Sequence, residues 1–260
     1  TRGFAADKED VMIQYAKISC TGDRPVNEDD CQVYQREASK AQTVYLLALA
    51  DGLGGHGKGE EASQLAVEMA GSIFQQENAE GEVLLPLIFE AVNQALLQRQ
   101  KEEHCQEAMK TTLNLVMIEE NRATIAHIGD SRTYLFRNGK LLMRTKDHSV
   151  PQALVASGEL REKKIRHHPD RNRVLRVLGV ADPRGARYEI EETISLQTGD
   201  VLLVCTDGFW EWILERQMEK TLKKSRGNMQ EWLDAMSLWV QKKGKGHSMD
   251  NHSAIVAIYQ

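Results

Sequence analysis

The sequence predicts one soluble globular domain of the α/β class. Its 260 residues are 41% hydrophobic and 27% charged, which is enough apolar material for one sizeable core. Short apolar runs end on aspartates at positions 51, 130 and 207, as expected of strands buried on both faces. Residues 60–76 and 83–106 instead carry apolar side chains at helical spacing.

The strands follow from apolar runs, alternating patterns and turn residues. Glu120-Asn121 and Asn138-Gly139 each separate two short apolar stretches, so both are predicted to be hairpin turns. The predicted strands are residues 11–19, 31–34, 46–51, 112–118, 123–128, 133–136, 141–142, 201–205 and 253–259.

The loop after Asp51 is rich in glycine and nearly matches two phosphate-binding motifs. Gly52, Gly54 and Gly57 fit the dinucleotide pattern, but the required second strand is replaced by further helix. The same loop begins a P-loop pattern, yet Gly59 stands where a Ser or Thr hydroxyl should meet magnesium. A nucleotide-binding protein is therefore disfavoured.

Four aspartates stand beside predicted strand ends, at Asp51, Asp130, Asp207 and Asp250. A single such residue is usually a turn or helix cap. If the strand ends converge, two carboxylates about 4 Å apart repel by roughly 4 kcal/mol at an effective dielectric near 20. Hard divalent cations with oxygen ligands would relieve that repulsion, and magnesium or manganese is favoured over zinc.

A second group of charges lies between the first two strands. Arg24 is followed by three consecutive acids, Glu28, Asp29 and Asp30. The segment could be a solvated acidic turn. Alternatively, its carboxylates need cations and Arg24 binds a phosphate with its planar fork.

Composition limits the partners. The net charge of -5 and the pI near 5.9 argue against a general nucleic-acid surface. The sequence has no run of 18 apolar residues and no signal-peptide pattern, so we expect no membrane insertion and a cytoplasmic location. Four cysteines lack CxxC spacing and are predicted to be buried thiols.

Two basic stretches stand out in this acidic chain. Residues 157–176 contain a cluster of Arg, Lys and His side chains that form either a solvated loop or a surface that steers acidic phosphorylated segments. They include Arg161, Lys163, Lys164, Arg166, His167, His168, Arg171 and Arg173. Residues 242–247 are predicted to form a loop, and we assign them no role.

Taken together, the motifs resemble those of the metal-dependent type-2C protein phosphatases, in the compact bacterial branch. The resemblance covers nearly the whole chain and rests on seven motifs in order. They are Arg24 with Asn27-Glu28-Asp29, Asp51 to Glu60, Thr111-Thr112-Leu113, Gly129 to Arg132, Asp147-His148-Ser149, Thr206 to Glu211, and Asp250-Asn251.

The resemblance implies an α/β (α+β) sandwich of two central mixed or antiparallel β-sheets flanked by antiparallel helix pairs, with a binuclear metal centre at one end. Residues 1–260 would form one catalytic domain, with a flap at about 150–176. The implied activity is hydrolysis of phosphoserine and phosphothreonine in proteins by a metal-activated water. Two Mn²⁺ or Mg²⁺ ions, with a third held weakly, would be the cofactors, and a monomer would act on targets of a Ser/Thr kinase.

The resemblance also implies a role for each matched residue. Asp51 would bridge two metals, the Gly52 carbonyl and Glu28 would serve the second, and Asp207 and Asp250 would hold the first. Asp130 would bind the third metal, Asp29 would orient water on the metals, and Arg24 would bind the phosphoryl oxygens.

The sequence departs from the family at two places. Leu53 follows Asp-Gly where eukaryotic relatives place a histidine near the loop, so His56 is only a candidate general acid. Lys110 replaces a usual glycine and removes no ligand. An inactive metal-binding interaction module on the same fold is the alternative function.

Overall fold

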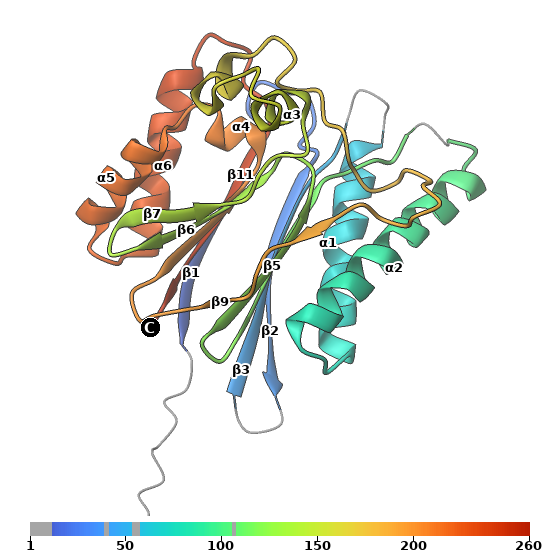
Figure 1. Cartoon of the computed structure of the whole chain (residues 1–260), viewed down its shortest axis with the longest axis horizontal. Helices are drawn as coiled ribbons and strands as arrows, with labels where there is room; N and C mark the ends of the chain where they lie inside the picture. The colour runs from blue at the N-terminus through green and yellow to red at the C-terminus, as the bar shows by residue number, and fades with distance from the viewer. Residues whose placement is uncertain (1–11, 39–41, 54–57, 106–107) are drawn as a thin grey trace, which may run out of the picture.

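Two β-sheets pack face to face and carry helices on their outer faces in the computed structural model (Figure 1). The structure describes residues 12–38, 42–53, 58–105 and 108–260. Every strand pairing among them is antiparallel. The predicted two-sheet sandwich is therefore confirmed, and its sheets are antiparallel rather than mixed.

The first sheet contains the two ends of the described chain. Its strand order is β1 (Ile13–Cys20), β11 (His252–Tyr259), β10 (Val201–Cys205), β6 (Arg132–Arg137) and β7 (Lys140–Arg144). Asn138 and Gly139, at the β6–β7 turn, both have positive φ, as a two-residue hairpin turn requires.

The second sheet carries the glycine-rich loop. Its order is β2 (Asp29–Ala38), β3 (Gln42–Asp51), β4 (Leu113–Glu119), β5 (Arg122–Ile128) and β8 (Glu189–Ile190), and β9 (Ile194–Ser195) also pairs with β5. Strand β2 is longer than predicted, because its pairing with β3 continues to Asp29 opposite Asp51.

Two helix pairs cover the outer faces. The helices α1 (Gly59–Gln76) and α2 (Gly81–Glu102) lie on the second sheet, and α5 (Glu215–Ser225) and α6 (Met229–Gly244) lie on the first (Figure 1). Helix α2 ends at Glu102, before the predicted limit of 106.

Alternate residues of β3 show why the strand is apolar throughout. Leu46 and Ala48 pack against the helices α1 and α2, whereas Leu47 and Leu49 pack between the two sheets. Full burial of an aliphatic side chain of this size contributes about 1.5–3 kcal/mol. This layering fixes the end of β3, and hence Asp51, at the edge of the sandwich.

The predicted flap contains α3 (Val150–Ala156) and the 3₁₀ helix η2 (Glu162–His167). Several of its cations are paired: Arg166 with Glu215, and Arg171 with Glu211 through two hydrogen bonds of 2.9 and 2.6 Å. The segment is therefore not simply a solvated basic loop. Whether it acts as a flap stays a prediction.

One loop prediction is wrong. Lys242, Lys243 and Gly244 belong to the last turn of α6, and only the residues after Gly244 leave the helix. Gly244 packs closely against Met249, since an added Cβ would lie 2.5 Å from the side chain of that residue.

The cysteines are free thiols, with Cys31 and Cys205 buried and Cys20 and Cys105 half-buried. In the described portion of the chain, none of the helices combines the length and apolar character needed to cross a membrane.

Candidate functional site

A cavity of about 270 Å³ opens where the ends of β3, β10 and β11 meet. The cavity contains nearly all the predicted site residues, and we call it the carboxylate cavity. The predicted site residues that line it are Arg24, Glu28, Asp51, Gly52, Asp130, Asp207 and Asp250. Convergence of these distant positions follows from the sandwich, in which both sheets present strand ends at one edge.

Asp51 and Asp29 face each other across the β2–β3 pairing. The backbone N–H of Asp51 donates to the Thr112 hydroxyl at 3.0 Å, and its carbonyl accepts from Thr112 N–H at 2.9 Å. These bonds tie the end of β3 to the start of β4. Burial, followed by the charges of Asp29 and Asp207, holds the pKa of Asp51 well above its ordinary value.

Asp29 is buried directly behind the cavity. Its Oδ2 accepts from the Thr206 hydroxyl at 3.0 Å, whereas its Oδ1 has no hydrogen-bond partner among the described residues. Burial, opposed by the hydroxyl of Ser253 and reinforced by the charge of Asp207, raises the pKa of Asp29 to about 8. A buried oxygen without a partner is costly unless a ligand satisfies it.

Asp207 is the first residue of the short helix α4 (Asp207–Trp210), immediately beyond β10. Burial and the charge of Asp250 raise its pKa to about 6. The following residue must be glycine, because a Cβ on Gly208 would lie 2.1 Å from the carbonyl oxygen of Asn251. This close approach brings the Asp207 and Asp250 segments together.

Arg24 stands at the exposed side of the cavity. Its Nη2 donates to Asp250 Oδ2 at 2.7 Å, and the two side chains are 54% and 34% exposed. Burial raises the pKa of Glu28, although the positive charge of Arg24 works against this. One guanidinium thus partly offsets the negative charge on one side of the site.

Asn251 positions the Arg24–Asp29 segment, a role that we did not predict. Its Oδ1 accepts from the Glu28 N–H at 2.8 Å, and its Nδ2 donates to the carbonyls of Thr21 and Val26 at 2.7 and 3.0 Å. The sequence signal was the Asp250-Asn251 motif itself. Asn172 and Val174 also line the cavity, and nothing in their local sequence singled them out.

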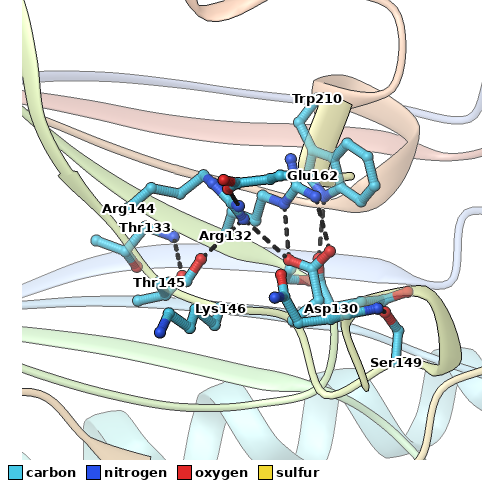
Figure 2. A network of polar contacts seen from close by, with 12 residues as sticks. Asp130, Arg132, Thr133, Arg144, Thr145, Lys146, Ser149, Glu162 and Trp210 are labelled. Atoms are coloured by element: carbon cyan, nitrogen blue, oxygen red, sulfur yellow. Dashed lines mark hydrogen bonds and ion pairs between the residues drawn. The ribbon is translucent and has the colours of Figure 1, made fainter. Parts of the chain in front are cut away.

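Asp130 is buried at the edge of the cavity, next to a compensated group of charges shown in Figure 2. Its carbonyl accepts from the Trp210 indole N–H at 2.9 Å. Burial and the charges of Asp207 and Asp147 keep the pKa of its carboxyl well above the ordinary value.

The compensated group, which we call the Arg132 network, consists of Arg132, Arg144, Asp147, Glu162 and Trp210. Arg132 donates to both oxygens of Asp147 at 2.7 Å, and its guanidinium lies 3.4 Å from the ring centroid of Trp210. Arg144 pairs with Asp147 and with Glu162 (Figure 2). Here, unlike in the cavity, each buried charge has a partner of opposite sign.

A separate group of possible metal ligands, His127, His148 and Glu189, has side-chain donor atoms within 4.8 Å of one another. The two imidazoles stack at 4.7 Å. Nδ1 of His148 accepts from the Gly129 N–H at 3.1 Å, so the neutral ring carries its proton on Nε2, which faces Glu189. That nitrogen offers no lone pair, and the arrangement does not fit a metal site.

The candidate acid His56 lies outside the described residues. None of the described residues that line the carboxylate cavity is a histidine.

Comparisons with known proteins agree with this geometry. The chain is 32% identical to the serine/threonine phosphatase stp of Listeria monocytogenes over 206 residues, 77% of this chain and 79% of that protein. The structure of Staphylococcus aureus Stp1 matches all of both chains with a TM-score of 0.85 and 26% identity. A structure of the PstP catalytic domain in complex with two manganese ions matches with a TM-score of 0.78 and 28% identity, covering 96% of this chain and 99% of that one.

The sequence profile of the family described as protein phosphatase 2C matches residues 19–252, and so includes every predicted site residue. The family predicted from the ordered motifs is therefore confirmed: this chain belongs to the protein phosphatase 2C family.

Proposed function

We propose that this protein hydrolyses phosphoserine and phosphothreonine esters in proteins, with divalent cations bound in the carboxylate cavity. The observation that carries the proposal is the group of carboxylates around Asp51, which is short of positive charge and open to solvent beside Arg24. Relatives that are named serine/threonine phosphatases support the reaction class.

The donor set suits hard divalent cations. The side chains that surround the cavity offer carboxylate oxygens, and the buried Oδ1 of Asp29 has no hydrogen-bond partner in the described part of the chain. Oxygen-only ligands favour Mg²⁺ or Mn²⁺ over zinc. In this proposal Asp51, Asp207 and Asp250, with Glu28 and the Gly52 carbonyl, hold two ions, and Asp130 holds a third ion weakly.

Bound divalent cations supply Lewis acidity and lower the pKa of coordinated water. The side chains of Arg24 and Asp29 then bind the phosphoryl group and orient the water. Arg24 presents a planar guanidinium at the mouth of the cavity, where two parallel N–H groups match a phosphoryl group. In this proposal Asp29, held by the Thr206 hydroxyl next to Asp51, would orient the water that attacks phosphorus.

The alternative, an inactive binding module, is less favoured, because all the predicted ligand side chains are present and converge on one cavity. We further propose a cytoplasmic monomer whose substrates are phosphorylated by a Ser/Thr kinase. These points rest on the family and on the chain's composition.

An activity assay tests the proposal. Phosphoserine, phosphothreonine and phosphotyrosine peptides, together with para-nitrophenyl phosphate, should be compared in manganese, in magnesium and in chelator. We expect metal-dependent release of phosphate from the first two peptides. Turnover that persists in chelator would contradict the metal proposal, and inactivity in every metal would favour the binding module.

A further inference from the structure

A groove of about 510 Å³ lies between the segment after α4 and the C-terminal end of α6. Its lining includes Glu211, Trp212, Arg216, Trp239, Lys243 and His247, and we call it the tryptophan groove. Two of these residues, Lys243 and His247, belong to the basic run at residues 242–247.

The groove exposes aromatic surface. Trp239 is 36% exposed, and the half-buried Trp212 packs against the exposed ring of His247, with ring centroids 5.3 Å apart. The Trp212 indole N–H is buried and has no acceptor among the described residues. Tryptophans of this kind often dominate the energy of protein–protein contacts.

The groove also has an excess of positive charge. Neither Arg216 nor Lys243 has a carboxylate within ion-pair distance in the described parts of the chain, and Lys243 lies 5.6 Å from the centre of the Trp239 ring. The Glu211 carboxylate, in contrast, accepts hydrogen bonds from Nε and Nη2 of Arg171. A groove of this charge on a chain of net charge -5 is complementary to an acidic partner.

The groove adjoins the carboxylate cavity. The Arg171–Glu211 ion pair separates them: Glu211 lines the groove, and Asn172, the residue after Arg171, lines the cavity. A polypeptide with its phosphorylated residue in the cavity can therefore reach the groove with a nearby segment.

We propose that the tryptophan groove binds an acidic segment of the protein substrate, one in which aspartates or glutamates flank an aromatic or large aliphatic side chain. The apolar side chain packs on Trp212 and Trp239, and the acids face Arg216 and Lys243. This proposal rests on the proposed phosphatase function and adds a docking site remote from the reacting phosphate.

Direct binding tests the groove independently of catalysis. The probe is a fluorescent, phosphate-free peptide with Leu-Phe flanked by glutamates, followed by anisotropy with the full chain. Trp239→Ala should weaken binding about tenfold. Leu238→Ala is the matched control, because Leu238 is 68% exposed on the same helix outside the groove and should bind normally.

Charge reversal tests the second half of the proposal. Lys243→Glu and Arg216→Glu should weaken binding and reduce its dependence on salt. Lys220→Glu makes the same change on an exposed residue outside the groove and should have little effect. Equal binding of a peptide with lysines in place of the glutamates, or no loss in Trp239→Ala, would overturn the proposal.

Kinetics connects docking to activity. On a phosphopeptide that carries the acidic segment, Trp239→Ala should raise KM several-fold at unchanged kcat, whereas hydrolysis of para-nitrophenyl phosphate should not change. Loss of all hydrolysis with intact peptide binding would refute the phosphatase function alone. Concentration-dependent dimerisation abolished by Trp239→Ala would instead assign the groove to a second copy and refute the substrate proposal.

Discussion

Arg132 and Asp147 bury opposite charges against each other, whereas Asp29 and Asp130, near the ends of neighbouring strands, are carboxyls buried close to other carboxyls. Arg132 satisfies both oxygens of Asp147, but one oxygen of Asp29 finds no partner among the described residues. Burial is similar in the two places. The chain can thus compensate a buried carboxylate such as Asp147, but at Asp29 we expect an external cation to do so.

The largest expected effect is loss of activity in Asp51→Asn. The change removes the charge at the centre of the carboxylate cavity while keeping the shape of the side chain. Loss of bound cations removes several kcal/mol of transition-state stabilisation, which corresponds to a rate loss of about a thousandfold or more. The measurement is kcat/KM on a phosphothreonine peptide in manganese.

The same variant also tests whether the Asp51 carboxylate stabilises the folded protein. Because Asp51 is buried among other carboxylates, the free energy of unfolding of the metal-free protein should be unchanged or raised in Asp51→Asn. Asp207→Asn should behave alike. An Asp51→Asn protein that is strongly destabilised without metal would show that this carboxylate is structural.

Arg132→Met should have the next largest effect, and it should act on stability. The change leaves Asp147 buried without its partner, which costs about 3–5 kcal/mol in the free energy of unfolding. Urea unfolding of the metal-free protein measures it. Arg184→Met, which breaks an ion pair with Asp182 on the surface, is the control and should cost far less stability than Arg132→Met.

If Arg132→Met and Arg184→Met lose equal stability, the buried ion pair does not contribute more to stability than the surface pair. Unchanged stability of Arg132→Met would show that the buried pair does not need both of its charges.

The stability of the metal-free protein should depend on pH through its buried carboxyl groups. The pKa of Asp29 rises from 3.8 to about 8 on folding, and that of Asp207 to about 6. Between these limits the folded state binds protons that the unfolded state releases, so stability falls as pH rises from about 4 to about 8. Each such carboxyl contributes a slope of at most about 1.4 kcal/mol per pH unit.

Urea midpoints across this range, in chelator and in manganese, test the slope. Added cation should stabilise the protein more at high pH, because it competes with protons for the same oxygens. Asp29→Asn should flatten the part of the curve above pH 6. A stability profile that rises with pH in chelator would contradict the raised pKa values.

The sequence was most informative where local pattern determines structure. The apolar run before Asp51 and the Asn138-Gly139 turn were both predicted, because burial on two faces and positive φ leave clear local signals. The ordered motifs also identified the residues that meet in the carboxylate cavity. The distance between motifs along the chain could not show that Asp29 pairs directly with Asp51, since an acidic turn and a strand start look alike.

Long-range compensation was not predictable. Arg166 and Arg171 find acids 49 and 40 residues away, so the basic segment seemed more exposed in the sequence than it is. The strands β8 and β9 are two residues long, too short for any periodicity. At Gly244 a glycine indicated a loop, although the residue belongs to α6 and packs closely against Met249.

The smallest expected effects occur at Asp130, where the two regions meet. Its carboxylate faces the cavity, whereas its carbonyl accepts the Trp210 N–H of the Arg132 network. In Asp130→Asn the carbonyl contact remains, so stability should change by less than about 1 kcal/mol. If the carboxylate holds a weak third ion, turnover of phosphopeptides should fall about tenfold while two ions still bind.

Trp210→Phe makes the complementary change, since it removes the N–H donor and keeps a ring beside Arg132. It should cost about 1 kcal/mol of stability, the usual contribution of one hydrogen bond, and leave metal stoichiometry intact. Calorimetric titration with manganese, together with kcat for each variant, distinguishes the effects of Asp130→Asn and Trp210→Phe. Loss of both tight ions in Asp130→Asn would place that carboxylate in the inner site, whereas full activity with poor leaving groups would remove it from the mechanism.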